Sequence, residues 1–263
     1  PKGWRGAVSH IVVYLVALVA ALPQITVLVT SFIGTINGSL FTGEFTLDNY
    51  RNIFAKSKNS AITNSYLFGL IAIVIVVVCG ILISYLSVRK RNALTSVLDV
   101  LTMFPYIIPG SVLGISFLYA FNGPPFMLGG TMLIIVISLS IRRMPYTIRS
   151  STAIIGQISP SVEEASISLG ASQLKTFLRV TIPMMLPGVL SGAILSWITC
   201  INELSSSVML YGGKTSTISV AIYTEVVRNS FGTAAALASI LTVSTVISLL
   251  IFLKVSKGKV SVV

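Results

Sequence analysis

The stretch that decides the fold runs from Asn59 to Val88 and reads NSAITNSYLFGLIAIVIVVVCGILISYLSV, without one charged side chain. A helix needs about 20 largely apolar residues to cross a bilayer, so this segment is long enough to span a membrane. Three further uncharged stretches have the same character, and they lie between Arg5 and Glu44, between Asp99 and Arg142, and between Arg228 and Lys254. The pattern predicts an integral membrane protein.

The composition of the 263-residue chain agrees with this class. Apolar residues make up 54% of it and charged residues only 10%, which is too few charges to cover the surface of a soluble protein. The many Val, Ile, Leu and Phe residues exclude a disordered chain. The net charge of +11 falls in short clusters between apolar stretches, and this placement indicates membrane orientation and no nucleic-acid partner.

Hydrophobicity predicts an all-α protein with six transmembrane helices in a single domain covering residues 1–263. The expected spans are about 9–33, 62–88, 94–119, 130–147, 185–208 and 232–253. A turn at Asn122-Gly123-Pro124-Pro125 separates the third span from the fourth, because no continuous helix carries that quartet. The first apolar stretch is longer than the core of a cleavable signal peptide. Since the chain starts at Pro1, we expect that an upstream piece was removed or that the chain belongs to a longer polypeptide.

The distribution of Lys and Arg predicts the orientation. With the N-terminus inside, 13 of the 18 basic residues lie in inner segments, as the positive-inside rule requires. Both termini are therefore expected in the cytoplasm, and the inner-segment residues are Lys2, Arg5, Arg89, Lys90, Arg91, Arg142, Arg143, Arg149, Lys175, Arg179, Lys254, Lys257 and Lys259. The outer segments hold Arg51, Lys56, Lys58, Lys214 and Arg228. Within the outer segment from Gly34 to Ser60, the residues around Asp48 to Phe54 predict a short amphipathic helix.

The inner loop, from about 147 to 183, has internal structure. Ser161 and Glu164 have the spacing of a capping box, with Pro160 at the helix start and Gly170 at its end. An apolar face is expected at Ile158, Val162, Ala165 and Leu169. Ser172 would cap a second short helix, with Leu174, Phe177 and Leu178 along one side, that ends at Pro183. The first helix either packs as a connector beneath its own bundle or docks on a cytoplasmic partner.

The same loop carries a family resemblance. Glu164-Ala165-Ser166, Gly170 and Val180-Thr181-Ile182-Pro183 resemble the EAA loop of permease subunits in type I ABC importers, with matching spacing. The chain departs from the family pattern by small or aliphatic changes at Ser166, Val180 and Ile182. The resemblance implies the type I ABC importer permease fold with a cytoplasmic coupling helix that binds an ATPase, and it implies coupling residues at Glu163, Glu164, Ala165, Ser166, Leu169 and Gly170.

The resemblance also implies an assembly in the bacterial inner membrane. The expected partners are two cytoplasmic ATPase subunits, an external solute-binding protein and a second permease half. The second half is either identical to this chain or a related half, and a related half could be fused upstream. The chain has no Gly-x-x-x-x-Gly-Lys-Ser/Thr phosphate loop, so ATP and Mg are expected on the partner subunits, with no cofactor and no enzymatic activity in this chain.

Glu203 is the acid that points to a translocation pathway. It is expected toward the outer end of span five, and an ionisable residue at membrane depth is by default a functional candidate. Asn202, Ser205 and Ser206 surround it with further polar side chains. The alternative is a structural role at the water interface, for instance an ion pair with Lys214. For Asp99, a local ion pair with the cluster from Arg89 to Arg91 is expected.

Small residues and cysteines within the apolar stretches are expected to serve helix packing. Gly110-x-x-x-Gly114 and Gly188-x-x-x-Gly192 predict close helix contacts. Cys79 and Cys200 are expected to be buried thiols with no disulfide, and no metal site is expected.

The substrate is approached through similarity alone. Glu203-Leu204-Ser205, Leu210-Tyr211-Gly212-Gly213, the segment 217–223 and the segment 231–236 look most like ferric-iron permeases, whose relatives move phosphonates, thiamine, sulfate or polyamines. A carboxylate suits a hard cation and a polyamine equally. From other classes, an intramembrane enzyme would need a histidine, and His10 is poorly placed, while a passive channel would need no docking helix.

Overall fold

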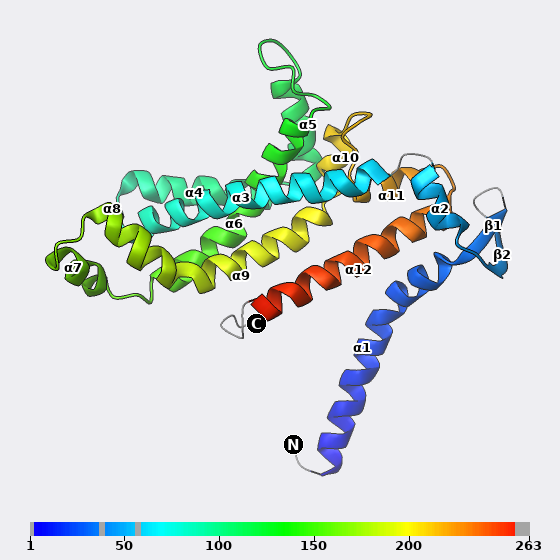
Figure 1. The fold of residues 1–263 in the computed structure, drawn as a ribbon, viewed down its shortest axis with the longest axis horizontal. Coiled ribbons are helices and arrows are strands. Elements are labelled where there is room, and N and C mark those ends of the chain that lie inside the picture. Colours follow the sequence, from blue (N-terminus) through cyan, green and yellow to red (C-terminus); the bar gives the residue numbers. More distant parts are fainter. Residues whose placement is uncertain (1–2, 37–39, 56–58, 256–263) are drawn as a thin grey trace. The chain divides into compact units, whose positions relative to one another are not determined.

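The computed structural model describes residues 3–36, 40–55 and 59–255, and these are mostly helical (Figure 1). Lys2, Lys56, Lys58, Lys257 and Lys259, which enter the predicted orientation, lie outside the described residues. The elements are α1 (Trp4–Thr30), β1 (Ile33–Ile36), β2 (Leu40–Phe45), α2 (Asp48–Ala55), α3 (Asn59–Arg89), α4 (Ala93–Ile107), α5 (Gly110–Phe121), α6 (Met132–Ile155), α7 (Pro160–Ser168), α8 (Gln173–Thr176), η1 (Phe177–Thr181), α9 (Ile182–Ile201), α10 (Ser207–Leu210), α11 (Ile218–Val227) and α12 (Phe231–Val255).

The described chain forms two compact units. One combines the segment before Ser60 with Ala221–Ser244, and the other combines Ser60–Val220 with the segment from Thr245 onward. Both candidate sites described below lie within the second unit, between Tyr85 and Ser206.

In the first unit, α1 leads into an antiparallel hairpin of β1 and β2 and then into α2. Asn49 ties α2 to the preceding chain, because its side-chain amide donates to the carbonyls of Ser31 (3.0 Å) and Ile33 (2.9 Å). Ile53 is fully buried. The helix predicted around Asp48 to Phe54 is therefore confirmed, whereas the hairpin was not predicted from the sequence.

In the second unit, α6 and α9 pack closely over most of their lengths. Glycines on α9 allow the approach: a Cβ on Gly192 would overlap the backbone at Thr147, and one on Gly188 would lie 2.6 Å from the Ser150 carbonyl oxygen. Small residues one turn apart let two helix backbones come together in this way. The close contacts predicted for Gly188-x-x-x-Gly192 are confirmed.

The third predicted span, 94–119, is wrong as one continuous helix. The structure divides it into α4 and α5, whose axes bend by 108° across the break. Ile108 is extended, with ψ of 131°, and Pro109 caps α5. A residue before proline avoids the helical region, and proline has no N–H to continue the helical hydrogen bonds, so the helix ends here.

The edges of the inner loop also need correction. α6 continues to Ile155, eight residues past its predicted end at 147. The second loop helix does not end at Pro183, because α8, η1 and α9 form one helical run from Gln173 to Ile201. At Ile182 the backbone N–H bonds to the Phe177 carbonyl, five residues back, and this wide π turn accommodates the proline that follows.

Four helices among the described residues are long and apolar enough to cross a membrane: Gly6–Thr30, Asn59–Arg89, Gln173–Ile201 and Phe231–Lys254. The bent pair of α4 and α5 makes a fifth if it counts as one span. α6, which carries Arg142, Arg143 and Arg149, is not among these four. The six-span count remains a prediction.

Candidate functional site

The first candidate site is the loop helix α7, whose start is set by local hydrogen bonds. The Ser159 hydroxyl accepts a hydrogen bond from the backbone N–H of Ser161 (3.4 Å), and Pro160 occupies the first helical turn, where its missing N–H costs nothing. The N-cap is therefore Ser159. The capping-box spacing of Ser161 and Glu164 had predicted Ser161 instead. The predicted helix itself is confirmed, with Glu163 in its first turn.

The end of α7 is a glycine corner. Gly170 has a φ of 88°, a conformation that costs a glycine little. Its N–H bonds to the Ile167 carbonyl (2.9 Å), and the N–H of Ala171 bonds to the Ser166 carbonyl (3.2 Å). These two bonds form a Schellman motif. The predicted stop at Gly170 and the predicted cap of α8 by Ser172, which accepts from the Lys175 N–H, are both confirmed.

Beyond the corner, α8 folds back against α7, and the hydroxyls of Ser166 and Thr176 meet at 2.9 Å. A cavity of about 200 Å³ lies between these helices and the end of α3, lined by Tyr85, Arg89, Lys90, Pro160, Glu163, Glu164, Ile167, Gln173 and Thr176.

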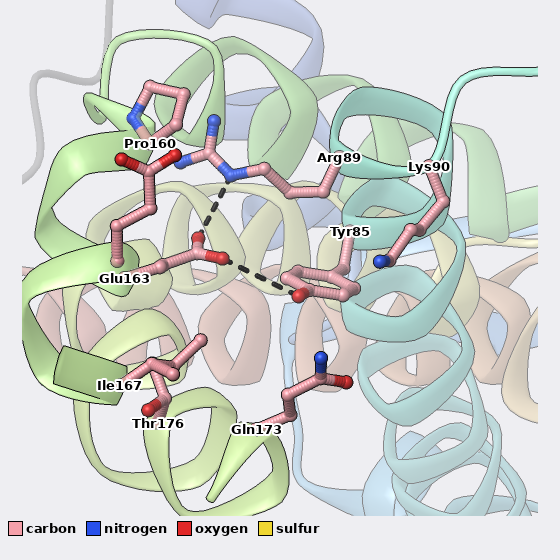
Figure 2. A pocket seen from close by; sticks show the side chains of 9 residues that line it. Tyr85, Arg89, Lys90, Pro160, Glu163, Ile167, Gln173 and Thr176 are labelled. Atoms are coloured by element: carbon pink, nitrogen blue, oxygen red, sulfur yellow. Dashed lines mark hydrogen bonds and ion pairs between the residues drawn. The ribbon is translucent and has the colours of Figure 1, made fainter. Parts of the chain in front are cut away.

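Glu163 anchors α7 to α3. Figure 2 shows its carboxylate between the guanidinium of Arg89 and the hydroxyl of Tyr85. Arg89 Nε lies 2.9 Å from Glu163 Oε1, and Arg89 Nη2 donates to the Ile158 carbonyl at 2.8 Å. Both partners of the ion pair are mostly buried, with 11% and 14% of their side chains exposed. One arginine thus holds both the first turn of α7 and the chain just before it.

The opposite side of α7 is exposed. Leu169, directly after α7, is 90% exposed, and Ala165 is exposed as well. Ile167 is 43% exposed but lies on the side of Glu163, where it lines the cavity. The predicted apolar face is therefore split: Ile158 is buried against the bundle and Val162 is partly buried, whereas Ala165 and Leu169 face outward. Glu164 is exposed as well, in contrast to its neighbour Glu163.

The second candidate site surrounds Glu203. α9 ends at Ile201, so Glu203 lies in the connection after the helix instead of within it. Its carboxylate is 3% exposed and is bonded by two arginines of α6. Arg142 Nη1 lies 3.2 Å from Glu203 Oε1, and Arg143 Nη2 contacts Glu203 Oε2.

Ser206 completes the coordination of this carboxylate. Its backbone N–H and its hydroxyl donate to Glu203 Oε1 at 2.9 and 3.2 Å, and Ser138 on α6 donates to the Ser206 hydroxyl at 3.1 Å. Asn202 and Ser205 are exposed, and the Asn202 amide bonds instead to the Ile198 carbonyl. Of the predicted pathway residues, Ser206 is the one that bonds to Glu203.

The ion-pair partners predicted from the sequence are wrong in two places. Glu203 pairs with Arg142 and Arg143, not with Lys214. Asp99 pairs with Arg149 at 3.2 Å, not with the cluster from Arg89 to Arg91. The two errors have different causes. Arg142 and Arg143 fall inside the predicted span 130–147 but were counted with the inner segments, whereas Arg149 lies beyond the predicted end at 147 and was left in a loop. The adjacent arginines directly after a long uncharged run were the signal for a buried partner.

The remaining polar groups form no obvious metal centre. No group of three or more His, Cys, Asp or Glu that could hold a metal ion occurs within residues 3–36, 40–55 and 59–255. Cys79 and Cys200 are free thiols, the latter buried.

Comparison with solved structures identifies the fold. A bacterial ABC transporter involved in the import of the acidic polysaccharide alginate contains a chain that matches this one with a TM-score of 0.73 over 95% of both chains, at 16% sequence identity. A chain of the MetNI methionine ABC transporter, in inward-facing conformations, matches with a TM-score of 0.61 over 77% of this chain and 94% of that chain, also at 16% identity. At this identity the likeness shows the fold of an ABC importer permease.

Sequence relatives are more closely similar. The ferric transport system permease protein FbpB of Actinobacillus pleuropneumoniae is 33% identical over 82% of this chain and 33% of its own length. The putative 2-aminoethylphosphonate transport system permease protein PhnV of Salmonella typhimurium is 28% identical over 98% of this chain and 95% of its own length. The chain spans about a third of the length of the first ferric relatives it matches.

The family model for the binding-protein-dependent transport system inner membrane component matches residues 77–259, which include α7, its glycine corner and the Glu203 cluster. With the EAA-type loop, the importer-permease fold and these relatives, the chain belongs to the family of binding-protein-dependent transport system inner membrane components.

Proposed function

We propose that the chain is the membrane-spanning permease subunit of an ATP-driven importer that translocates ferric iron delivered by an external solute-binding protein. The observation that carries the coupling part of this proposal is the two-sided character of α7. Glu163 holds one side to α3 through Arg89, while Leu169 and its apolar neighbours are left exposed. A helix that is fixed to its own bundle and still offers an apolar surface suits docking into a groove on a partner.

The partner that suits this surface is an ATPase subunit. The described chain supplies the exposed Ala165 on α7 and the exposed Leu169 directly after it, with Glu164 and, on α8, Leu174 as further exposed residues. Ser166 and Gly170 act indirectly, since they fix how α7 turns into α8. We assign the docking contacts to the exposed residues and the positioning of α7 to Glu163.

The assembly follows from the same proposal. Two ATPase subunits would bind ATP and Mg on the cytoplasmic side, a second permease half would complete the pathway, and the binding protein would deliver cargo outside. Residues 1–263 would form one permease domain with six spans and both termini in the cytoplasm of a bacterial cell. The basic residues assigned to inner segments support this orientation, apart from Arg142 and Arg143, which α6 holds in the buried cluster around Glu203.

Ferric iron is supported as cargo by two relatives that are named as ferric permeases, at 33% and 32% identity. A phosphonate is the second candidate, because the PhnV relatives match this chain over 98% of its length and 95% of theirs. In either case we place the pathway at the exposed polar groups of Asn202 and Ser205 and at the Glu203–Ser206 pair.

The substitution Leu169→Asp tests the docking role. A carboxylate in an apolar groove loses its hydration without a partner, which costs several kcal/mol, so we expect the ATPases to stop copurifying and ATP-driven uptake to fall at least tenfold. Gln157→Asp is the matched control, since Gln157 is also exposed but lies before α7. Unchanged copurification and uptake in Leu169→Asp would contradict the proposal.

A further inference from the structure

The cluster around Glu203 has an excess of positive charge. Arg142 and Arg143 bring two guanidinium groups, and Glu203 is the carboxylate that bridges them. All three are largely buried, with 13%, 12% and 3% of their side chains exposed. The bonded group therefore carries one net positive charge at a depth from which water is mostly excluded.

The other acids of this unit are engaged elsewhere. Asp99 pairs with Arg149, Glu163 pairs with Arg89, and Glu164 is exposed on α7. The Nε atoms of Arg142 and Arg143 are both buried without a hydrogen-bond partner. These two donors show that the guanidinium groups have hydrogen-bonding capacity that the described residues do not use.

The start of α5 adds to the positive potential. A Cβ on Gly110, the first residue of α5, would overlap Arg142 Nη1, so the N-terminal end of this helix lies directly against the guanidinium. No side chain within the described residues caps that end. The N-terminus of a helix carries a partial positive charge, so it adds to the positive potential at the arginine and favours binding of an anion there.

An uncompensated charge in a buried site is costly, and such groups in membrane proteins commonly mark the path of a solute. Two neighbouring guanidinium groups present planar sets of N–H donors that match carboxylate, phosphate and phosphonate oxygens. A bare cation would be repelled here. Both oxygens of the one carboxylate that could attract it are already held by arginine.

We infer that the cargo passes this level of the membrane as an oxyanion, and that Arg142 and Arg143 bind its anionic oxygens in place of the Glu203 carboxylate. Glu203 is then a built-in counter-ion that occupies the two arginines until cargo displaces it. The inference rests on the proposed permease function and sets its substrate class. The anionic oxygens belong either to the ligands that accompany a ferric ion or to a phosphonate.

Binding of simple anions tests the inference without partners or ATP. The full-length protein is reconstituted in lipid nanodiscs, and its thermal midpoint is measured with inorganic phosphate, citrate or spermidine at constant ionic strength. We expect phosphate or citrate to raise the midpoint and spermidine to leave it unchanged. Arg143→Gln keeps a neutral Arg142–Glu203 pair, so the fold should persist while the anion affinity falls by roughly tenfold or more, the factor for losing a hydrogen bond to a charged group.

The matched control is Arg149→Gln, which removes a charge from the same helix but from an exposed pair, and it should keep the full response to anions. Glu203→Gln frees both arginines and should increase the rise in thermal midpoint that anions cause. No response in either the wild type or Glu203→Gln would overturn the inference, as would an equal response in Arg143→Gln or an equal effect of spermidine. Failure of ATPase docking in Leu169→Asp leaves this binding experiment unaffected, so the two proposals fail separately.

Uptake by the reconstituted importer then identifies the source of the anionic oxygens. Labelled ferric citrate and labelled 2-aminoethylphosphonate are compared in parallel. Uptake of the first assigns the oxygens to ligands of ferric iron, and uptake of the second assigns them to the phosphonate. Uptake of spermidine alone would contradict an oxyanion cargo.

Discussion

Adjacent residues in α7 have opposite surroundings. Glu163 is bonded to Arg89 and lies close to the Tyr85 hydroxyl, whereas Glu164 is exposed. The sequence places both acids in the first turn but cannot distinguish them, because which one faces the bundle depends on how α7 packs against α3. The resemblance assigned both to coupling, and we propose a positioning role for the first and a contact role for the second.

Removal of Arg89 should loosen α7 without altering its exposed face. In Arg89→Gln the partly buried Glu163 carboxylate loses its ion pair, and we expect a stability loss of about 1–3 kcal/mol. We also expect ATP hydrolysis to continue with reduced transport, because a loosely held helix transmits less of the motion of the ATPase. Chemical unfolding and paired ATPase and uptake assays measure both effects.

Lys90→Gln is the control for this change, since it removes the next basic residue from an exposed position. It should behave as the wild type in both assays. Equal stability of Arg89→Gln and Lys90→Gln would contradict the anchoring role of Arg89.

Glu203 shows the limit of sequence reasoning at the residue scale. A lone acid at membrane depth indicates a functional or ion-paired group from the sequence alone. Its partners could not be named, because Arg142 and Arg143 lie 61 and 60 residues away in the chain. Their approach depends on how α6 packs against α9 and the segment after it, and this tertiary packing cannot be read from hydrophobicity along the chain.

At the scale of elements, features set by neighbouring residues were predictable. The Gly170 corner, the Ser172 cap and the existence of α2 follow from local hydrogen bonding and backbone preferences, and all three are present. The effect of a proline on a helix was not predictable, because it depends on whether the surrounding backbone can rearrange to accommodate it. Pro109 breaks a helix, whereas Pro183 is accommodated by a π turn within one.

The contact between α6 and α9 should be sensitive to one methyl group. In Gly192→Ala the new Cβ would overlap Thr147 and lie 2.9 Å from the Tyr146 carbonyl oxygen, and backbone atoms cannot rotate away. We expect a loss of about 1–3 kcal/mol in the free energy of unfolding, the range for overpacking a tight interior. Unfolding in a detergent series measures it.

Gly213→Ala provides the comparison, because a Cβ at Gly213 would meet nothing within 4 Å. That variant should be as stable as the wild type. If both alanine variants unfolded at the same point, the close contact between α6 and α9 would not limit stability.

At the scale of the whole molecule, composition identified a membrane protein and the EAA-type loop identified its family. The number of spans is less accessible to sequence. In the part of the chain that the structure describes, four helices qualify by length and hydropathy, and the bent α4–α5 pair adds a fifth only if both halves count as one crossing. Arg142 and Arg143 of α6 pair with Glu203, and the same two charges lower the mean hydropathy by which α6 would be recognised as a membrane span.

The proposed orientation can be tested with single cysteines. In a Cys79→Ala/Cys200→Ala background, Leu169→Cys and Phe54→Cys place a thiol on two exposed positions, directly after α7 and in α2 respectively. We expect a membrane-impermeant maleimide to label Phe54→Cys in intact spheroplasts and Leu169→Cys only in inverted vesicles. The opposite pattern would reverse the topology predicted from the basic residues.

The two sides of α7 have a consequence for how the gene can vary. The Arg89–Glu163 contact lies within one chain, so compensating changes at these two positions can arise in a single gene. On the proposed docking mode, Leu169 is matched by a surface encoded in another gene, so a change there requires a second change elsewhere in the genome. An alignment of orthologues should show Arg89 and Glu163 drifting as a pair, while Leu169 stays fixed in lineages that share one ATPase.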